Sequence, residues 1–152
     1  MALTDEQLLS RFHAYAAAFE TAFASDDWSV LEPFFTADAS NELNGGRVEG
    51  RSAVLQAFHD SVTMFDRRFD RRALRFVDGP AVEDGVVHLK AAVRYERRGL
   101  PALEVLGEEW FHFVGDRIQR HVDQVLNLDA VMTYLAQHND ALRPLSAAST
   151  AA

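Results

Sequence analysis

The sequence predicts an α+β fold, in which three N-terminal helices pack on a curved antiparallel or mixed sheet and a short helix closes the chain. Apolar residues recur every three or four positions in the first 65 residues, as on the buried face of a helix. From about residue 72 they alternate instead, in segments separated by glycine-containing turns, as in strands joined by hairpins. Strands with such short connections are antiparallel neighbours. The preceding helices would then cover one face of the sheet.

The first helix is predicted to begin at Thr4, because its side chain can cap the helix and Gln7 follows three residues later, as in a capping box. A single apolar stripe runs along this helix, made by Leu8, Phe12, Tyr15, Phe19 and Phe23. The helix is expected to end where residues 25–27 interrupt the stripe with a serine and two aspartates.

Two further helices and a short strand are predicted before the sheet. The second helix is a short amphipathic segment that carries Trp28, Leu31, Phe34 and Phe35. Residues 39–43 form a strand, and the turn at residues 44–46 follows it. The third helix opens at residues 50–52 and carries Val54, Leu55, Phe58, Val62 and Phe65.

Turn sequences divide the rest of the chain into strands. We expect strands at residues 73–77, 81–82, 86–96, 102–114 and 117–126, and a closing helix at residues 127–138. One face of the strand at residues 86–96 is apolar and must point to the core, and it is made by Leu89, Ala91, Val93 and Tyr95.

Length and charge exclude several classes of protein. The 152 residues suffice for one core, so we expect a single domain over residues 1–143 and a flexible tail at residues 144–152. A formal charge of -8 repels phosphate groups and argues against nucleic acid or an anionic membrane as partner. The arginines at residues 67–72 are expected to pair with nearby acids.

The chain contains no cysteine, which rules out disulfides, a thiolate nucleophile and cysteine-based zinc sites and fits a cytoplasmic protein. The first residues include acids and lack the basic segment of a signal peptide, and no apolar run has the length of a membrane span.

Four stretches in this order resemble the nuclear transport factor 2-like superfamily, in its SnoaL-like and ketosteroid isomerase-like group. They are SDDWSVL at residues 25–31, FTADA at 35–39, VEGRSAV at 48–54 and the turn-containing stretch at 113–123. The resemblance covers about residues 5–126 and implies a cone-shaped α+β fold. It leaves the activity open, since this fold is shared by isomerases, cyclases, dehydratases, hydrolases and binding modules.

The resemblance can be carried over residue by residue. Phe19, Leu43 and Phe58 stand where ketosteroid isomerases have a tyrosine, their base aspartate and a second tyrosine, so steroid isomerisation by that mechanism is not expected. Glu109 matches the acid that donates a hydrogen bond to the oxyanion in those enzymes. Asp123 resembles the aspartate on the last long strand of limonene epoxide hydrolases and SnoaL-like cyclases.

Strand phasing brings these two acids together with a histidine. On the strand at residues 102–114 the odd-numbered face is the more apolar one, and Glu109 is its one charged member. Across the turn at residues 115–116, odd-numbered residues of the next strand face the same way if Phe113 lies opposite residue 117 or 119, which puts Glu109 opposite His121 or Asp123. Tyr95 is expected within reach. The even-numbered face, with Ile118 and Val122, would lie outside beside Trp110.

Two carboxyls in an apolar site cannot both ionise without a large cost, so one should be protonated near neutral pH while the other acts as a base. We assign Asp123 as the base, His121 as its orienting partner or the acid, and Glu109 as the oxyanion donor. The alternative is a structural hydrogen-bonded cluster without turnover. A metal site at these residues is disfavoured because the chain has no HExxH-like spacing.

The sequence therefore predicts a cofactor-independent acid-base enzyme (isomerase, cyclase, dehydratase or hydrolase) that acts on a small hydrophobic molecule. The residues expected to line its pocket are Tyr15, Phe19, Trp28, Asn41, Phe58, Tyr95 and Phe111. The alternatives are a non-catalytic binding module with the same pocket and a dimeric protein without one. Leu106 and Trp110 on the outer sheet face suggest a homodimer through that face.

Overall fold

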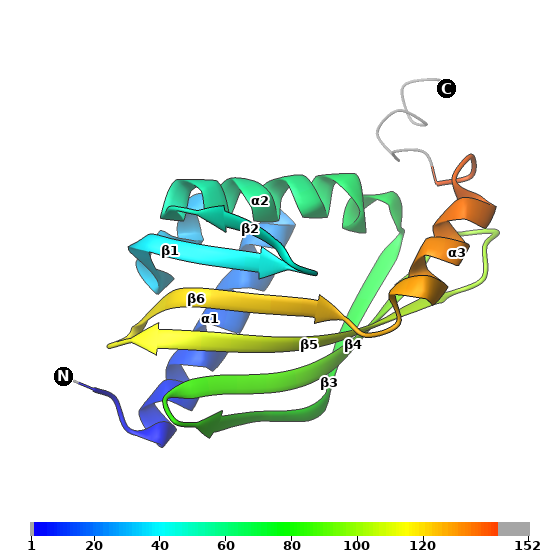
Figure 1. The fold of residues 1–152 in the computed structure, drawn as a ribbon. Coiled ribbons are helices and arrows are strands. Elements are labelled where there is room, and N and C mark those ends of the chain that lie inside the picture. Colours follow the sequence, from blue (N-terminus) through cyan, green and yellow to red (C-terminus); the bar gives the residue numbers. More distant parts are fainter. Residues whose placement is uncertain (1, 143–152) are drawn as a thin grey trace.

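The computed structural model describes residues 2–142, and the predicted tail at residues 144–152 lies outside this range. Two strands lie between the second and the third helical segment of the chain, and the remaining strands and a closing helix follow (Figure 1). The elements are helix α1 (Asp5–Ser25), 3-10 helix η1 (Trp28–Phe34), strands β1 (Phe35–Leu43) and β2 (Gly46–Glu49), helix α2 (Arg51–Met64), 3-10 helix η2 (Asp66–Arg68), strands β3 (Arg71–Glu83), β4 (Val86–Glu96), β5 (Leu103–Val114) and β6 (Arg117–Val125), and helix α3 (Leu128–His138).

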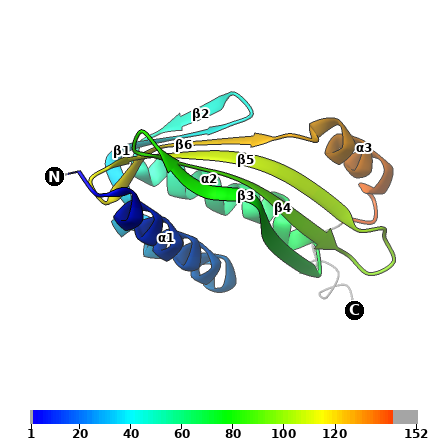
Figure 2. The same cartoon turned by 90° about the horizontal axis from the view of Figure 1, so that it is seen from below.

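The six strands form one mixed sheet in the order β2-β1-β6-β5-β4-β3. Only the β1–β6 pair is parallel, and the other neighbours are antiparallel. Helices α1 and α2 lie on the same face of the curved sheet, and α3 lies at the end where β6 finishes (Figure 2). The predicted α+β fold, with its N-terminal helices on a mixed sheet and its closing helix, is confirmed.

The ends of the helices are set by local side-chain contacts. At the start of α1, the Gln7 amide donates to Thr4 Oγ1 over 3.2 Å and the Thr4 amide donates to Gln7 Oε1 over 2.9 Å, which is the predicted capping box. The Asp27 carboxyl accepts from the Ser29 amide and caps η1. This second helix is of the 3-10 type and contains Pro33, which cannot donate a helical hydrogen bond.

Three strand predictions were wrong, and bulges or weak patterns explain them. Residues 73–77 and 81–82 belong to one continuous strand, β3, because residues 78–80 form an irregularity inside the strand and not a hairpin turn. Strand β1 begins at Phe35, four residues before the predicted start. Strand β2 was not predicted, and it pairs with β1 through the turn after Leu43.

A bulge in β6 also changes which face Ile118 occupies. Phe113 lies opposite Ile118 and His112 opposite Arg120, so the extra residue, Gln119, has no partner on β5. Ile118 is therefore completely buried, where the prediction put it on the outer face, and Gln119 is exposed. Beyond the bulge the predicted phase holds.

The buried apolar residues form two clusters on the helix-covered side. The larger cluster packs α1, η1 and α2 against the middle of the sheet and includes Phe35, Leu89 and Phe111. The second cluster lies around α3 and is made by Phe69, Tyr95, Leu103, Val131, Tyr134 and Leu142. Within residues 2–142, none of the helices has the length and apolar character that a membrane crossing requires.

Candidate active site

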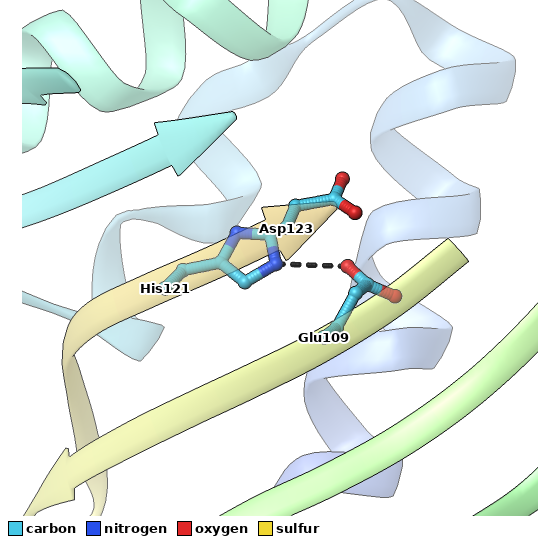
Figure 3. A group of neighbouring side chains, drawn as sticks. All are labelled: Glu109, His121 and Asp123. Atoms are coloured by element: carbon cyan, nitrogen blue, oxygen red, sulfur yellow. Dashed lines mark hydrogen bonds and ion pairs between the residues drawn. The ribbon is translucent and has the colours of Figure 1, made fainter. Parts of the chain in front are cut away.

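Glu109 on β5 and His121 and Asp123 on β6 converge on the helix-covered face of the sheet (Figure 3). Glu109 lies directly opposite Asp123, and Phe111 lies directly opposite His121. One ligand atom from each of the three side chains lies within 4.8 Å of the other two. Antiparallel pairing on a common face thus brings together the three residues that the strand phasing predicts.

His121 is the most enclosed member of this group, with 4% of its surface exposed. Its ring stacks on Phe111 at 4.4 Å between centroids and 11° between planes, and Phe58 covers it at 6.0 Å. Its Nε2 lies 2.8 Å from Glu109 Oε1. Burial lowers the pKa of His121, but the hydrogen bond with Glu109 and the charges of Glu109 and Asp123 outweigh burial and leave the pKa raised. The pair therefore favours an imidazolium beside a carboxylate.

Asp123 differs from Glu109 in having no hydrogen-bond partner for its carboxyl among residues 2–142. Burial, followed by repulsion from Glu109, raises the pKa of Asp123 to about 7, although the charge of His121 opposes the shift. Gly107 lies on the same face of β5, and a Cβ atom there would be 3.8 Å from Asp123 Oδ1. The absence of a side chain at Gly107 leaves one side of the carboxyl uncovered.

Tyr15 extends the site from helix α1. Its phenol is buried, and burial together with the charges of Glu109 and Asp123 raises its pKa well above the usual value. The hydroxyl therefore stays protonated and can donate a hydrogen bond. The sequence predicts Tyr15 only in the pocket wall, because the helix-one tyrosine of ketosteroid isomerases aligns with Phe19. The available signal was that the two residues are four apart on one helical stripe.

The predicted aromatic lining forms a connected wall next to His121. Ring centroids of Phe19 lie 5.4 Å from Trp28 and 5.8 Å from Phe58, and Trp28 lies 6.3 Å from Phe58. Tyr15 lies 5.5 Å from Phe111. The structure thus brings Phe19, Trp28, Phe58 and Phe111 to the neighbourhood of the imidazole, as edge-on and tilted ring contacts of ordinary geometry.

The remaining two predicted residues lie in different places. Asn41, on β1, is in register with His121 and is buried. Tyr95 lies six positions along β4 from Leu89, the residue opposite Glu109, which corresponds to about 20 Å of strand. Its hydroxyl donates to Asp66 Oδ2 over 2.8 Å within the second cluster. The structure therefore does not bring Tyr95 to the two carboxyls.

Glu109, His121 and Asp123 also supply one imidazole nitrogen and two carboxylate oxygens, a donor set suited to a divalent metal ion. Within residues 2–142, Glu109, His121 and Asp123 form the one group of side chains close enough together to hold a metal ion. A proton and a divalent metal ion would therefore compete for the same three side chains.

No family model matches the sequence, and no curated protein matches it. Solved structures do match. Bal32a, from a soil-derived mobile gene cassette, is 21% identical, with a TM-score of 0.64 over 86% of this chain and 97% of the other. A protein of Jannaschia sp. CCS1 assigned to the SnoaL-like polyketide cyclases is 16% identical, with a TM-score of 0.59 over 79% and 90% of the two chains.

A protein of unknown function from Cytophaga hutchinsonii, described as NTF2-like, is 14% identical, with a TM-score of 0.55 over 74% of this chain and 97% of its own. The chain has the nuclear transport factor 2-like fold. Other solved structures with this fold are assigned as a polyketide cyclase and as a hydroxylase. The likeness establishes the fold, and the activity has to be argued from the residues in the site.

Proposed function

We propose that the protein is a cofactor-independent acid-base enzyme that moves a proton on a small, largely apolar substrate. The observation that carries the proposal is Asp123, a carboxyl with a pKa of about 7 and no hydrogen-bond partner among residues 2–142, two positions along β6 from His121, whose ring Phe58 and Phe111 cover. A group with a pKa near the working pH is best suited to both accept and return a proton. The solved structures of this fold assigned as polyketide cyclases are compatible with proton transfer next to a carbonyl.

In the proposed reaction, Asp123 takes a proton from the carbon next to a substrate carbonyl. The negative charge that develops on the carbonyl oxygen is stabilised by a hydrogen bond from the Tyr15 hydroxyl. Asp123 then returns the proton to a different carbon of the enolate, which gives isomerisation, or the enolate carbon attacks a second carbonyl and Asp123 gives its proton to the alkoxide so formed, which gives cyclisation. We assign the donor role to Tyr15 and not to Glu109, because the Glu109 carboxylate is engaged by His121.

Hydrogen-deuterium exchange tests the proposal without knowledge of the natural substrate. A panel of small cyclic and aromatic ketones with acidic C–H bonds is incubated with the protein in D2O, with no cofactor added. Proton NMR should show loss of the α-proton signal of at least one ketone with the wild type and not with Asp123→Asn. Binding of ketones by both proteins without exchange in either would favour the alternative of a non-catalytic binding module.

Glu109→Gln should move the pH dependence of this exchange to lower pH. Asp123 must be ionised to act as a base, so the rate rises with pH through about 7. Removing the Glu109 charge takes away a cause that raises the Asp123 pKa, and the midpoint should fall. Glu104→Gln is the matched control, since Glu104 pairs with Arg75. An unchanged midpoint in Glu109→Gln would show that the two acids do not interact.

We also propose that two copies of the chain associate through the outer sheet face. Trp110 lies opposite Val122 and His88 on this face, and its ring stacks on the His88 ring at 5.3 Å. Trp110→Glu should give a monomer, because it replaces the ring at the proposed contact by an unpaired carboxylate. Analytical ultracentrifugation measures the outcome, with Val114→Glu as a control at an exposed strand end. A sedimentation coefficient unchanged by Trp110→Glu would exclude this interface.

A further inference from the structure

Gly107 lies in the interior of β5, where a glycine weakens a strand because it has no side chain to pack. The backbone does not require a glycine at this position. Its φ is not in the left-handed region, unlike that of Gly79 or Gly85. It pairs in register with Ala91 on β4 and with Val125 on β6, so it does not form a bulge. Another residue could therefore adopt the same backbone conformation.

Packing does not require a glycine at position 107 either. A Cβ atom added there would lie 3.7 Å from the Gln124 carbonyl oxygen and 3.8 Å from Asp123 Oδ1, which are ordinary van der Waals distances. Apart from its chain neighbours, it would meet no other atom of residues 2–142 within 4 Å. A glycine inside a strand also marks places where a ligand approaches the backbone closely. The free space that Gly107 leaves is next to the Asp123 carboxyl.

Exposure along the helix-covered face of the sheet shows how far this free space extends. Phe111 and His121 at one end of the face are buried, and so are Tyr95 and Leu103 at the other end. Between these ends, every residue of this face on β5 and β6 is partly exposed, and so is one on β4: Glu109, Gly107, Val105, Asp123, Val125 and Val93. We call Val93, Val105 and Val125 the valine strip. The partly exposed part of the face thus has acids at one end and valines at the other.

We propose that Gly107 is a specificity-determining residue, whose missing side chain lets the reacting carbon of an apolar fused-ring ketone reach Asp123 while the rings lie on the valine strip. This inference rests on the proposed function and adds the class of substrate. A carbon and the oxygen that removes its proton have to be about 3–3.5 Å apart. An alanine Cβ at 3.8 Å from Asp123 Oδ1 would occupy the space that the reacting carbon needs.

The length and the chemistry of the valine strip favour a ring system over a short ketone. Val93 lies four positions along β4 from Leu89, the residue opposite Glu109, which corresponds to about 13 Å of strand. Valine side chains offer apolar contact and no hydrogen bond, so burying apolar rings on them is favourable. The ketone oxygen of such a molecule would stay at the acidic end, near Asp123.

An NMR titration with β-tetralone, a fused-ring ketone, tests the proposal without turnover. In the wild type, binding should shift the methyl signals of Val105 and Val125. Gly107→Ala should weaken binding about tenfold, the usual order of effect for one misfitting methyl group in an apolar site. Gln124→Val is the control, because it adds an apolar side chain at an exposed position of β6 on the outer face. It should bind β-tetralone as the wild type does.

Proton exchange with two ketones separates a steric effect from an effect on Asp123 itself. Acetone has no rings to hold it on the valine strip, so it can move away from an added methyl group. Gly107→Ala should therefore slow the exchange of β-tetralone and leave that of acetone nearly unchanged. Equal losses for both ketones would overturn the proposal, because the methyl group would then act on Asp123 and not on the substrate.

Urea denaturation shows whether the fold needs this glycine. Gly107→Ala should unfold at the same or a higher urea concentration than the wild type, because an alanine fits and a glycine weakens a strand. A lower midpoint would overturn the proposal, and so would equal affinities of the wild type and Gly107→Ala for β-tetralone. If β-tetralone binds as expected but the wild type exchanges neither ketone, the proposed function has failed and the role of Gly107 in binding is retained.

Discussion

Asp123→Asn should reduce the rate of α-proton exchange by about 10²- to 10⁴-fold, the usual contribution of a positioned general base. Asparagine has nearly the same shape and cannot accept a proton at neutral pH. Binding of a ketone that the wild type exchanges should be retained, since the aromatic wall is unchanged. The rate constant from NMR and the dissociation constant from titration separate the two effects. Asp116→Asn, in the exposed turn between β5 and β6, is the control and should alter neither.

The same substitution should stabilise the fold at high pH. The pKa of Asp123 is raised from 3.8 to about 7, so folding favours the protonated form. Its contribution to stability is present below pH 4 and is lost as the pH rises through about 7. Above that pH the buried carboxylate costs about 2–4 kcal/mol, after allowance for its partial exposure. Asparagine does not incur this cost.

Urea denaturation at two pH values checks this expectation. At pH 8 the free energy of unfolding of Asp123→Asn should exceed that of the wild type, and near pH 4 the two should agree. A variant that loses both activity and stability at pH 8 would contradict the assignment, because it would mean that the ionised carboxyl is satisfied in the folded protein. A gain in stability together with a loss of activity is what a strained catalytic group produces.

Gly79→Ala should have the largest effect on stability away from the site. Gly79 has φ +77°, and an added Cβ would lie 2.7 Å from the His88 carbonyl oxygen and 3.0 Å from the Ala81 nitrogen. Both are backbone atoms, so β3 and β4 would have to separate at the bulge. We expect a loss of about 3–5 kcal/mol from this clash and the unfavourable φ together.

Gly85→Ala is a matched control for Gly79→Ala. Its φ of +75° is nearly the same, but an added Cβ would meet nothing within 4 Å. It should lose only the cost of the left-handed backbone, about 1–2 kcal/mol. The difference between the two variants in urea denaturation isolates the contact with β4. Equal losses would show that the strands can adjust around an alanine in the bulge.

Periodicity predicted most of the elements because their apolar residues face one way. Strand β4 was predicted with its observed ends, and its predicted core face is buried at Leu89, Ala91 and Tyr95. A bulge cannot be predicted in this way, because strict alternation assumes that every residue of a strand has a partner on the next strand. Gln119 in β6 and the segment around Gly79 in β3 look like ordinary strand and turn in the sequence. The misplaced face of Ile118 follows from the first of them.

The sequence predicted the convergence of Glu109, His121 and Asp123 because they lie beyond the β6 bulge, where the phase is regular. The alternation of residues in a strand predicts which face of the sheet a residue occupies, but not its position along the neighbouring strands. For this reason Tyr95 was predicted on the correct face but too close to the two acids. The register of Asn41 with His121 depends on the parallel β1–β6 pair, which no turn in the sequence indicates. Side-chain protonation depends on all of these contacts together.

The parallel pairing of β1 with β6 has a consequence for how the molecule folds. The Asn44 side chain accepts from the Val125 amide, a contact between residues 81 positions apart in the sequence. Such long-range closure is slow compared with forming helices and hairpins, because the intervening chain must first be ordered. The hairpin of β5 and β6 can bring the two acids together early, whereas β1 can pair with β6 only after the chain between them is ordered. The NMR signal of the Val125 amide, which donates to Asn44, should therefore report this late step of folding.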